Sequence, residues 1–398
     1  MTTVDHVAVR PSGPAAHPDG CPAAAPGTPG HRTGGAVGTV GAATSLLDAY
    51  EPGRARFFAS PTRTLLAHGE RARVPHGDTP LARRVTETLD AQRLAGHRTP
   101  LVVGTVPFDP TAPAELAVPE AVRWAPALAD DPLIALHAAA RWDIRPVPGP
   151  AAYGAAVAEA VRRMKRGDFA KVVLARTLEL RSDRELDLPA LLQRLARRDP
   201  GGYTFAVPSG PGRTLLGASP DLAEDVRRAA ALLQSEKDLH EHSVVVDAVR
   251  DALAPYCRTL DVPLRPTLVR TAAMWHLSTT IGGELADPAV SALELAAALH
   301  PTPAVCGTPT RTAREVIGEL EPFDRGHFTG MVGWGDANGD GEWVVTIRCA
   351  EAEERTLRLY AGAGVADRSS PEAETAETGA KFRTFLDAVG ANHQEAAR

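Results

Sequence analysis

The chain has 398 residues, of which 44% are hydrophobic and 23% are charged, as in a globular protein rather than a disordered one. This length allows one large unit of helices and strands or two ordinary domains. Lys and Arg number 43 against 49 Asp and Glu, so the formal net charge is −6. Because binding to nucleic acid through bulk charge needs a basic face, the composition argues against a nucleic-acid-binding protein.

No segment of the sequence indicates a membrane span, and the first residues, MTTVDHVAVRPSG, do not resemble a secretory signal. The cysteines, Cys21, Cys257, Cys306 and Cys349, lie far apart without CxxC spacing, so they predict neither a disulfide framework nor a zinc knuckle. Residues 1–43 are rich in Pro, Gly and Ala and cannot bury enough apolar area to offset the entropy of ordering. We therefore expect a cytoplasmic enzyme with a disordered leader over 1–43 and one catalytic domain over 44–398.

Strand and helix patterns follow in runs along the chain. Residues 56–69 alternate and break at a Pro, as a pair of strands does, and residues 81–94 have helical spacing. Further strands are expected at 100–108, 171–180, 203–208, 213–219, 326–336, 341–354 and 356–366, and further helices at 153–164, 188–195, 224–253 and 372–389. Asn338-Gly339-Asp340-Gly341 predicts a hairpin turn. Because the strands come in consecutive runs, the pattern predicts an α+β fold with antiparallel sheets and not a Rossmann or TIM arrangement.

Two charged helical segments could hold a metal ion. In SEKDLHEH, residues 235–242, the two histidines are two positions apart, point about 200° apart on a helix and cannot share a zinc ion. Glu374 and Glu377 share a helix face, and Lys381 follows one turn later. Carboxylates of this kind favour a hard cation such as Mg²⁺. A solvated charged surface explains the first segment equally well, and an ordinary surface ladder of Glu and Lys explains the second better when it is taken alone.

Three further positions could bind or act on a small anion. Arg348 lies in an apolar strand and needs an anionic partner if it points inward, for which a carboxylate suits its guanidinium. Gly362, near the end of a strand, would let a ligand approach the backbone, although a tight turn explains it equally well. Lys171 opens an apolar strand and could act as a base there, although a lysine that extends out of the strand end is commoner.

These segments occur in the order found in the chorismate-utilising enzymes: KVVLAR, LGASPDL, SEKDLHEH, MWHLSTTI, LHPTPAVCGTP, ELEPFDRGHFTGMVGW, GEWVVTIRCA, LRLYAGAGV and ETGAK. From about Ser45 to Leu386 the chain resembles the isochorismate synthases. RFFASPTRTLLAHG and VVGTVPFDP are similar to the siderophore type of the enterobactin and bacillibactin pathways. The resemblance implies a chorismate-binding fold like that of anthranilate synthase component I, with helices packed outside antiparallel sheets. It also implies a Mg²⁺-dependent isomerase that adds water at C2 of chorismate, expels the C4 hydroxyl and feeds siderophore (2,3-dihydroxybenzoate) or related biosynthesis.

The resemblance implies a role for each matching residue. Lys171 matches the base that activates water, and Asp221 stands where the family has its general acid. The metal ligands would be Glu241 and Glu377 with Glu374 close by, and the substrate-binding residues would be His276, Ala304, Arg348, Gly362 and Lys381. Chorismate would be the small-molecule substrate of a monomer that binds no nucleic acid or membrane, with channelling to a downstream isochorismatase as an option.

The sequence departs from the family pattern at three places. Asp221 replaces a Glu and is shorter by one methylene, about 1.5 Å of reach. Ala223 runs directly into Glu224, where the family has a hairpin and a Pro-Leu-Ala-Gly turn whose amides help hold the substrate. Thr375 stands where a Trp is usual. Two alternatives therefore stay open, a salicylate synthase and a catalytically impaired homologue that binds chorismate.

Overall fold

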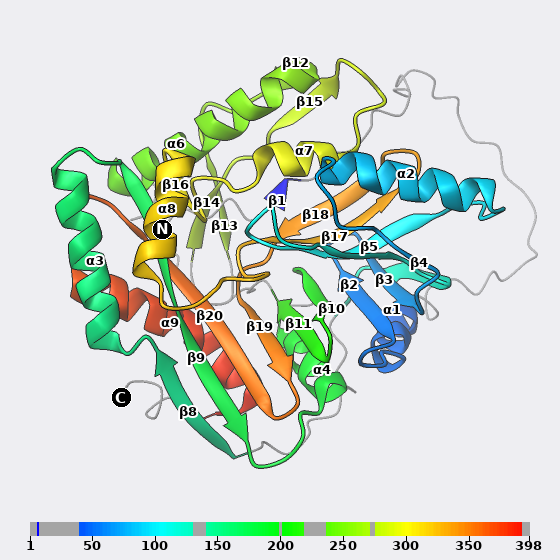
Figure 1. Ribbon diagram of the computed structural model, residues 1–398, viewed down its shortest axis with the longest axis horizontal. Coiled ribbons are helices and arrows are strands. Elements are labelled where there is room, and N and C mark those ends of the chain that lie inside the picture. The colour runs from blue at the N-terminus through cyan, green and yellow to red at the C-terminus, as the bar shows by residue number, and fades with distance from the viewer. Residues whose placement is uncertain are drawn as a thin grey trace, which may run out of the picture.

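The computed structural model describes residues 6–7, 40–129, 141–198, 201–218, 236–270 and 275–391. They form two large antiparallel sheets and two short strand pairs, with helices on the outside (Figure 1). The α+β class expected from the runs of strands is confirmed.

The larger sheet has ten strands in the order β16-β9-β20-β19-β11-β10-β2-β3-β7, and β8 shares with β16 the second edge of β9. Its strands are β2 (Ala55–Ala59), β3 (Arg63–His68), β7 (Ala121–Pro126), β8 (Trp142–Val147), β9 (Lys171–Ser182), β10 (Thr204–Gly210), β11 (Arg213–Ala218), β16 (Gly307–Thr308), β19 (Cys349–Glu353) and β20 (Thr356–Val365). The long strands β9 and β20 pair from Arg181 opposite Thr356 to Val172 opposite Val365.

The smaller sheet has six strands in the order β1-β18-β17-β5-β6-β4. Its strands are β1 (His6–Val7), β4 (Ala72–Arg73), β5 (Leu101–Val106), β6 (Glu115–Val118), β17 (Met331–Asp336) and β18 (Gly341–Val345). The predicted Asn-Gly-Asp-Gly turn joins β17 to β18, and Gly339 adopts a φ of 90° there, which favours glycine. The pairs β12 (Cys257–Asp261) with β15 (Gly282–Leu285) and β13 (Thr267–Arg270) with β14 (Trp275–Ser278) complete the strands.

The ten-stranded sheet is apolar on both faces, because both are covered. Successive residues of a strand point to opposite faces. Phe57 and Leu66 pack under helices, whereas Phe58 and Leu65 pack against Val332 and other residues of the six-stranded sheet. Strands that are buried on both faces read as continuous apolar runs, which explains the pattern of 171–180.

The helices cover the outer faces of the two sheets (Figure 1). Helices α1 (Val40–Asp48), α4 (Leu188–Arg198) and α9 (Pro371–Val389) pack on the ten-stranded sheet, and α3 (Pro150–Lys165) and α8 (Thr310–Leu320) pack beside β9. Helices α2 (Leu81–Leu94) and α7 (Ala292–Leu299) cover the six-stranded sheet. Helix α6 (Glu236–Leu253), followed by the turn η1 (Ala254–Tyr256), packs on α7.

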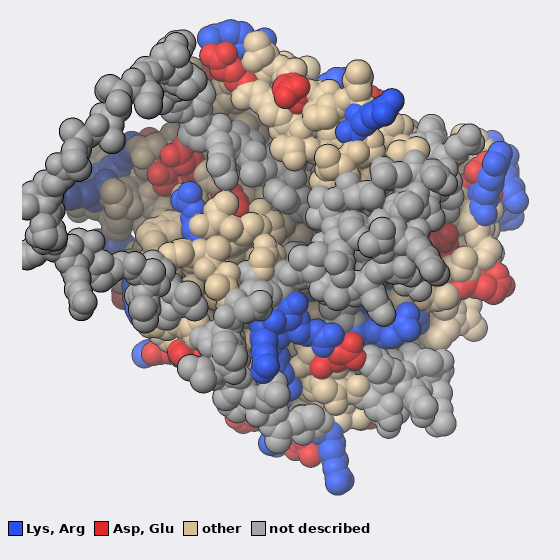
Figure 2. Space-filling model, turned by 180° about the vertical axis from the view of Figure 1, so that it is seen from behind, with Lys and Arg blue, Asp and Glu red and all other residues tan. Residues whose placement is uncertain are grey.

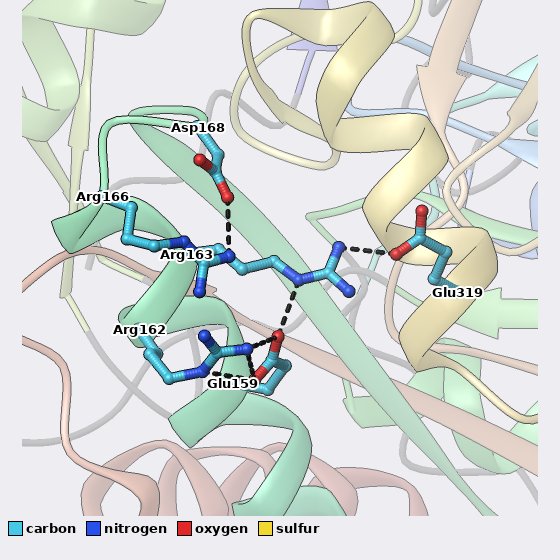
Figure 3. Close-up of polar contacts among 6 residues, drawn as sticks. All are labelled: Glu159, Arg162, Arg163, Arg166, Asp168 and Glu319. Atoms are coloured by element: carbon cyan, nitrogen blue, oxygen red, sulfur yellow. Dashed lines mark hydrogen bonds and ion pairs between the residues drawn. The ribbon is translucent and has the colours of Figure 1, made fainter.

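A surface ion-pair network joins α3 to α8 beside the start of β9 (Figure 3). Arg163 lies between two carboxylates, with Nε 2.8 Å from Glu159 Oε1 and Nη1 2.5 Å from Glu319 Oε2. Arg166 pairs with Asp168 at 2.9 Å in the turn that leads into the strand. Exposed pairs of this kind contribute about 0–1 kcal/mol each, so burial in the apolar cluster beneath them fixes the helices.

The expected elements between residues 55 and 218 and after residue 330 are confirmed, with ends that differ by a few residues and with one exception. The single strand expected over 341–354 is two strands, β18 and β19, which lie in different sheets. Arg348, expected inside that strand, lies in the segment between them. The expected helix 224–253 is described from Glu236 onward, and its first part lies outside the described residues. The sequence analysis did not predict the helices α1, α7 and α8 or the short strands β4, β6, β7, β8 and β12–β16. Of the expected leader 1–43, His6–Val7 form β1 and pair with β18, and residues 40–43 begin α1, with Ala43 buried in the core. Residues 8–39 lie outside the described residues.

The described surface carries both signs of charge. Seen from behind, Lys and Arg form one compact group below the centre, with Asp and Glu beside it, and elsewhere the two signs are scattered (Figure 2). The described part of this face thus has no broad basic area of the kind that binding through bulk charge needs. Within the described ranges, no helix has both the length and the apolar character needed to cross a membrane.

The buried His327 is expected to make the free energy of unfolding depend on pH. It is 8% exposed, its Nδ1 lies 3.2 Å from Thr105 Oγ1, and burial lowers its pKa to about 4, with Arg213 acting in the same direction. In the unfolded chain the pKa returns to about 6.5, so the unfolded state takes up the proton first and stability falls as the pH drops from 6.5 toward 4. We expect His327→Gln to remove about 2 kcal/mol of the loss in unfolding free energy between pH 7.5 and 5, measured by urea unfolding.

The matched control is His76→Gln, because His76 is exposed in the loop before α2. This variant is expected to keep the wild-type change in unfolding free energy between the two pH values. Identical pH dependence in wild type and His327→Gln would contradict the assignment.

Candidate functional site

Charged side chains cluster where α9 packs on β20. Glu377 Oε1 lies 3.0 Å from Lys381 Nζ, and the same ammonium donates a hydrogen bond to the carbonyl oxygen of Gly362. The spacing of four residues puts both side chains on one helix face. The Lys381 side chain is 9% exposed and that of Glu377 is 30% exposed, so the ammonium is enclosed while the carboxylate is open on one side.

The start of α9 is fixed by its sequence. Ser370 Oγ accepts a hydrogen bond from the backbone N–H of Ala373 at 3.1 Å, and Pro371 occupies the first turn. This start places Glu374 on the same side of the helix as Glu377, and Glu374 is 4% exposed. The i, i+3 pair expected from the sequence therefore forms.

Arg348 belongs to the same cluster and lies in the segment between β18 and β19. It is 9% exposed, and its backbone has a φ of 49°, in the left-handed region. Burial lowers the pKa of Lys381 and the charge of Arg348 acts in the same direction, whereas Glu377 and Glu374 oppose them. Two cations and two carboxylates thus share one buried neighbourhood at the junction of the two sheets.

Tyr153 of α3 lies beside this cluster, which the sequence reasoning missed. Its hydroxyl donates to the carbonyl oxygen of Leu174 on β9 at 3.1 Å. Burial raises the pKa of Tyr153, and the charges of Glu374 and Glu377 raise it further. In the sequence Tyr153 looks like one more apolar position of a helix, and no local signal sets it apart.

Arg176 holds α9 against β9. Its Nε donates to Thr378 Oγ1 at 2.9 Å and its Nη2 to the carbonyl oxygen of Thr375 at 3.2 Å, and it is 3% exposed. Its guanidinium lies over the rings of Tyr153 and Phe382 at 5.7 and 5.4 Å. The carboxylates of α9 are therefore fixed relative to the sheet.

Lys171 is the first residue of β9 and is 9% exposed, opposite Thr308 of β16. Lys171, Val173 and Ala175 share one face of the strand. Gly362 faces the last two, since a Cβ built on it would lie 3.3 Å from Val173 Cγ1 and 3.5 Å from Ala175 Cβ. Lys171 thus extends from the same face of β9 as the two side chains that pack closely on Gly362.

Other expected site residues are described in part. Asp221 and the side chains of Glu241 and His276 lie outside the described residues, while the backbones of the last two belong to α6 and β14. Ala304 is half-buried in the loop between α7 and β16. His242, beside Glu241, is 3% exposed, and its Nε2 lies 2.7 Å from Thr279 Oγ1.

The two carboxylates of α9 fit a hard cation. Mg²⁺ is commonly bound through one or two carboxylates together with water and oxygens of a substrate. Glu374 and Glu377 offer such oxygens on one helix face beside two cations. Among the side chains that the structure describes, no group of three His, Cys, Asp or Glu lies close enough to hold a metal by itself.

Comparison with known proteins identifies the family. The model of the family described as "Chorismate binding enzyme" matches residues 136–222 and 221–390. Isochorismate synthase DhbC of Bacillus subtilis is 52% identical, with 88% of this chain and 97% of that protein covered. The vibriobactin-specific isochorismate synthase of Vibrio cholerae is 39% identical, with coverage of 89% and 96%.

Solved structures agree on the fold. The crystal structure of DhbC from Bacillus anthracis superimposes with a TM-score of 0.82 at 47% identity, over 88% of this chain and 100% of that one. Anthranilate synthase component I from Streptococcus pneumoniae shares the fold, with a TM-score of 0.67 at 18% identity over 85% and 93% of the two chains.

The family match is divided into two segments close to the place where the sequence lacks the hairpin of the family pattern. Its two segments meet at residues 221–222, beside the junction of Ala223 and Glu224. The alignment with the Bacillus subtilis protein has 387 positions yet uses 88% of this chain, so that relative has residues without a counterpart here. The match nevertheless includes α9 and the strands of both sheets from β8 onward. The resemblance drawn from the motifs is confirmed: the chain belongs to the family of chorismate-binding enzymes.

Proposed function

We propose that the protein is an isochorismate synthase that converts chorismate to isochorismate for siderophore biosynthesis through 2,3-dihydroxybenzoate. The observation that carries the proposal is 52% identity to a protein named isochorismate synthase DhbC, over 97% of that protein's length. The relative named for vibriobactin, at 39% identity, supports the siderophore branch.

Arg348 and Lys381 would hold the carboxylates of the substrate. Chorismate is a dianion, and a chain of net charge −6 attracts it only where cations are concentrated. A guanidinium offers two parallel donors to a carboxylate, and the ammonium of Lys381 is already fixed by Glu377 and Gly362. The half-buried Ala304, together with His276 and Gly362, would line the rest of the site.

Lys171 would take a proton from the water that attacks C2, and Asp221 would deliver one to the departing C4 hydroxyl. A base must lie within hydrogen-bond reach of the proton that it removes, and the burial of Lys171 at the end of a rigid strand limits its freedom to move away. Asp221 is the weaker part of this pair, since it is shorter than the Glu of the family pattern.

Glu241, Glu374 and Glu377 would hold Mg²⁺. When bound, the ion would neutralise part of the negative charge of the substrate. The pairing of Glu377 with Lys381 would then make the metal site and the carboxylate site one electrostatic unit.

A coupled assay with an isochorismatase separates this function from the two alternatives. Isochorismate alone supports the proposal, salicylate with pyruvate supports a salicylate synthase, and no product from bound chorismate supports an impaired homologue. The gap in the family match beside Ala223 is the observation that favours the last of these. A monomer, a cytoplasmic location and channelling to an isochorismatase stay predictions.

The first prediction concerns the metal. Glu377→Gln removes a charge from the proposed Mg²⁺ site while keeping the size of the side chain. We expect it to abolish Mg²⁺-dependent turnover with the fold intact, measured by the rate against Mg²⁺ concentration and by circular dichroism. Glu372→Gln, at an exposed position of the same helix, is the control. Wild-type activity of Glu377→Gln at limiting Mg²⁺ would rule out the assignment.

The second prediction concerns the base. Lys171→Ala is expected to lower kcat by at least about 10²-fold, the lower range for general base catalysis, while chorismate still binds. Steady-state rates and a binding titration measure the two effects, and Lys165→Ala, at the exposed end of α3, is the control. Lost binding with an unchanged kcat would instead make Lys171 a group that holds the substrate.

The third prediction concerns the shortened segment. Inserting a family-like hairpin with a Pro-Leu-Ala-Gly turn between Ala223 and Glu224 is expected to lower KM for chorismate by about tenfold or more. Each restored hydrogen bond to a charged group contributes roughly 1.5–3 kcal/mol. The unfolding midpoint should also rise through added apolar burial.

The control for this insertion is a Gly-Ser linker of equal length at the same place, which should improve neither quantity. A low-micromolar KM in the chain as it stands, with a midpoint that the hairpin does not raise, would show that the shortened segment is harmless.

A further inference from the structure

Among the strands that the structure describes, none pairs with residues 173–176 on one edge of β9. β20 pairs with the whole of the other edge, from Val172 to Arg181. On the first edge, β16 pairs with Lys171 and Val172, and β8 pairs with residues 177–182. The backbone groups of residues 173–175 on this edge therefore need partners from elsewhere, because buried backbone polar groups are costly to leave unpaired.

A buried ion pair supplies these partners. Glu321 Oε1 accepts a hydrogen bond from the backbone N–H of Ala175 at 2.7 Å, and Arg325 Nη2 donates to the carbonyl oxygen of Val173 at 2.7 Å. The two side chains pair with each other at 2.6 Å, and each is 2% exposed. They replace, with side-chain groups, the strand that the edge lacks between β16 and β8.

The same arginine also holds the loop before β16. Arg325 Nη1 donates to the carbonyl oxygen of Val305 at 2.9 Å and to Thr329 Oγ1 at 3.2 Å. Its guanidinium lies 4.8 Å from the centre of the Phe108 ring. In addition, the carbonyl oxygen of Cys306 accepts a hydrogen bond from Val173 N at 2.8 Å. One guanidinium thus joins the strand that begins with Lys171 to the loop that contains Ala304.

Stability alone does not explain a buried pair of this kind. A buried Arg–Glu pair loses the hydration of two charges, and apolar residues of similar volume are often as stable or more stable. Apolar side chains could not, however, form the hydrogen bonds to the backbone groups of Val173, Ala175 and Val305. We propose that Glu321 and Arg325 are positioning residues that fix Lys171 and the 302–306 loop relative to each other. The inference rests on the proposed function for the role of Lys171.

The decisive variant is the double substitution Glu321→Leu and Arg325→Met, which removes the backbone partners without leaving a buried charge. We expect amide hydrogen exchange to become faster in peptides covering 171–176 and 302–306 and to stay unchanged in β2 and β3. We also expect kcat to fall by about 10-fold to 100-fold, by more than any rise in KM, since misplacement by about 1 Å costs on the order of 10²-fold.

The matched control is Arg56→Met with Glu70→Leu. Arg56 is 5% exposed and pairs with Glu70 at 2.9 Å, at β2 and the turn after β3, and neither partner bonds to β9. This control is expected to keep wild-type kcat and wild-type exchange at 171–176. If the Glu321/Arg325 double variant does not fold, the same hydrogen-exchange and kcat measurements are made on Arg325→Lys. A lysine keeps the buried charge but cannot reach all the same acceptors.

The proposed function and the positioning role of Glu321 and Arg325 are overturned by different results. No isochorismate from the wild-type chain overturns the proposed function, and the exchange measurement then still decides whether the pair holds β9 and the loop. Unchanged exchange at 171–176 and 302–306, or a kcat that stays at the wild-type value in an active folded variant, overturns the positioning role.

Discussion

The antiparallel pairing of β9 with β20 is the constraint on which the rest of the structure depends. It sets Val172 opposite Val365 and Ala175 opposite Gly362, so the Lys171 end of one strand meets the glycine-rich end of the other. A shift of one residue would turn every side chain of β9 to the opposite face. Arg176 would then lose its hydrogen bonds to α9, and Lys171 would no longer share a face with the residues that pack on Gly362. The pairing register of β9 with β20 therefore decides which side chains can reach the proposed site.

Electrostatics explains how a protein of net charge −6 could take an anionic substrate. Its charges are mixed at the surface, and the described surface offers exposed ion pairs such as Arg163 with Glu319. The cations that we propose bind the substrate are buried, and a charge inside the protein is screened less by salt and water than one outside. Burial and the charge of Arg348 lower the pKa of Lys381, and the charges of Glu377 and Glu374 oppose that shift.

Local patterns were sufficient for the long elements and for the charged residues of one helix. The Ser-Pro start and the spacing of Glu374, Glu377 and Lys381 are properties of neighbouring residues, so the sequence could predict the face that they form. Tyr153 and the Glu321–Arg325 pair could not be found this way, since their partners lie far along the chain on β9. Short strands such as β8 were missed because they are stabilised by pairing and not by their own composition.

The left-handed backbone of Arg348 has a consequence for how this enzyme could evolve. A non-glycine residue in that region carries strain of roughly 1–2 kcal/mol, which Gly would relieve and Asn would reduce. Such replacements would relieve this strain but would remove the cation that we propose binds a substrate carboxylate. On that proposal, a change at position 348 that raises stability would lower activity, so selection for heat resistance alone would act against the site there.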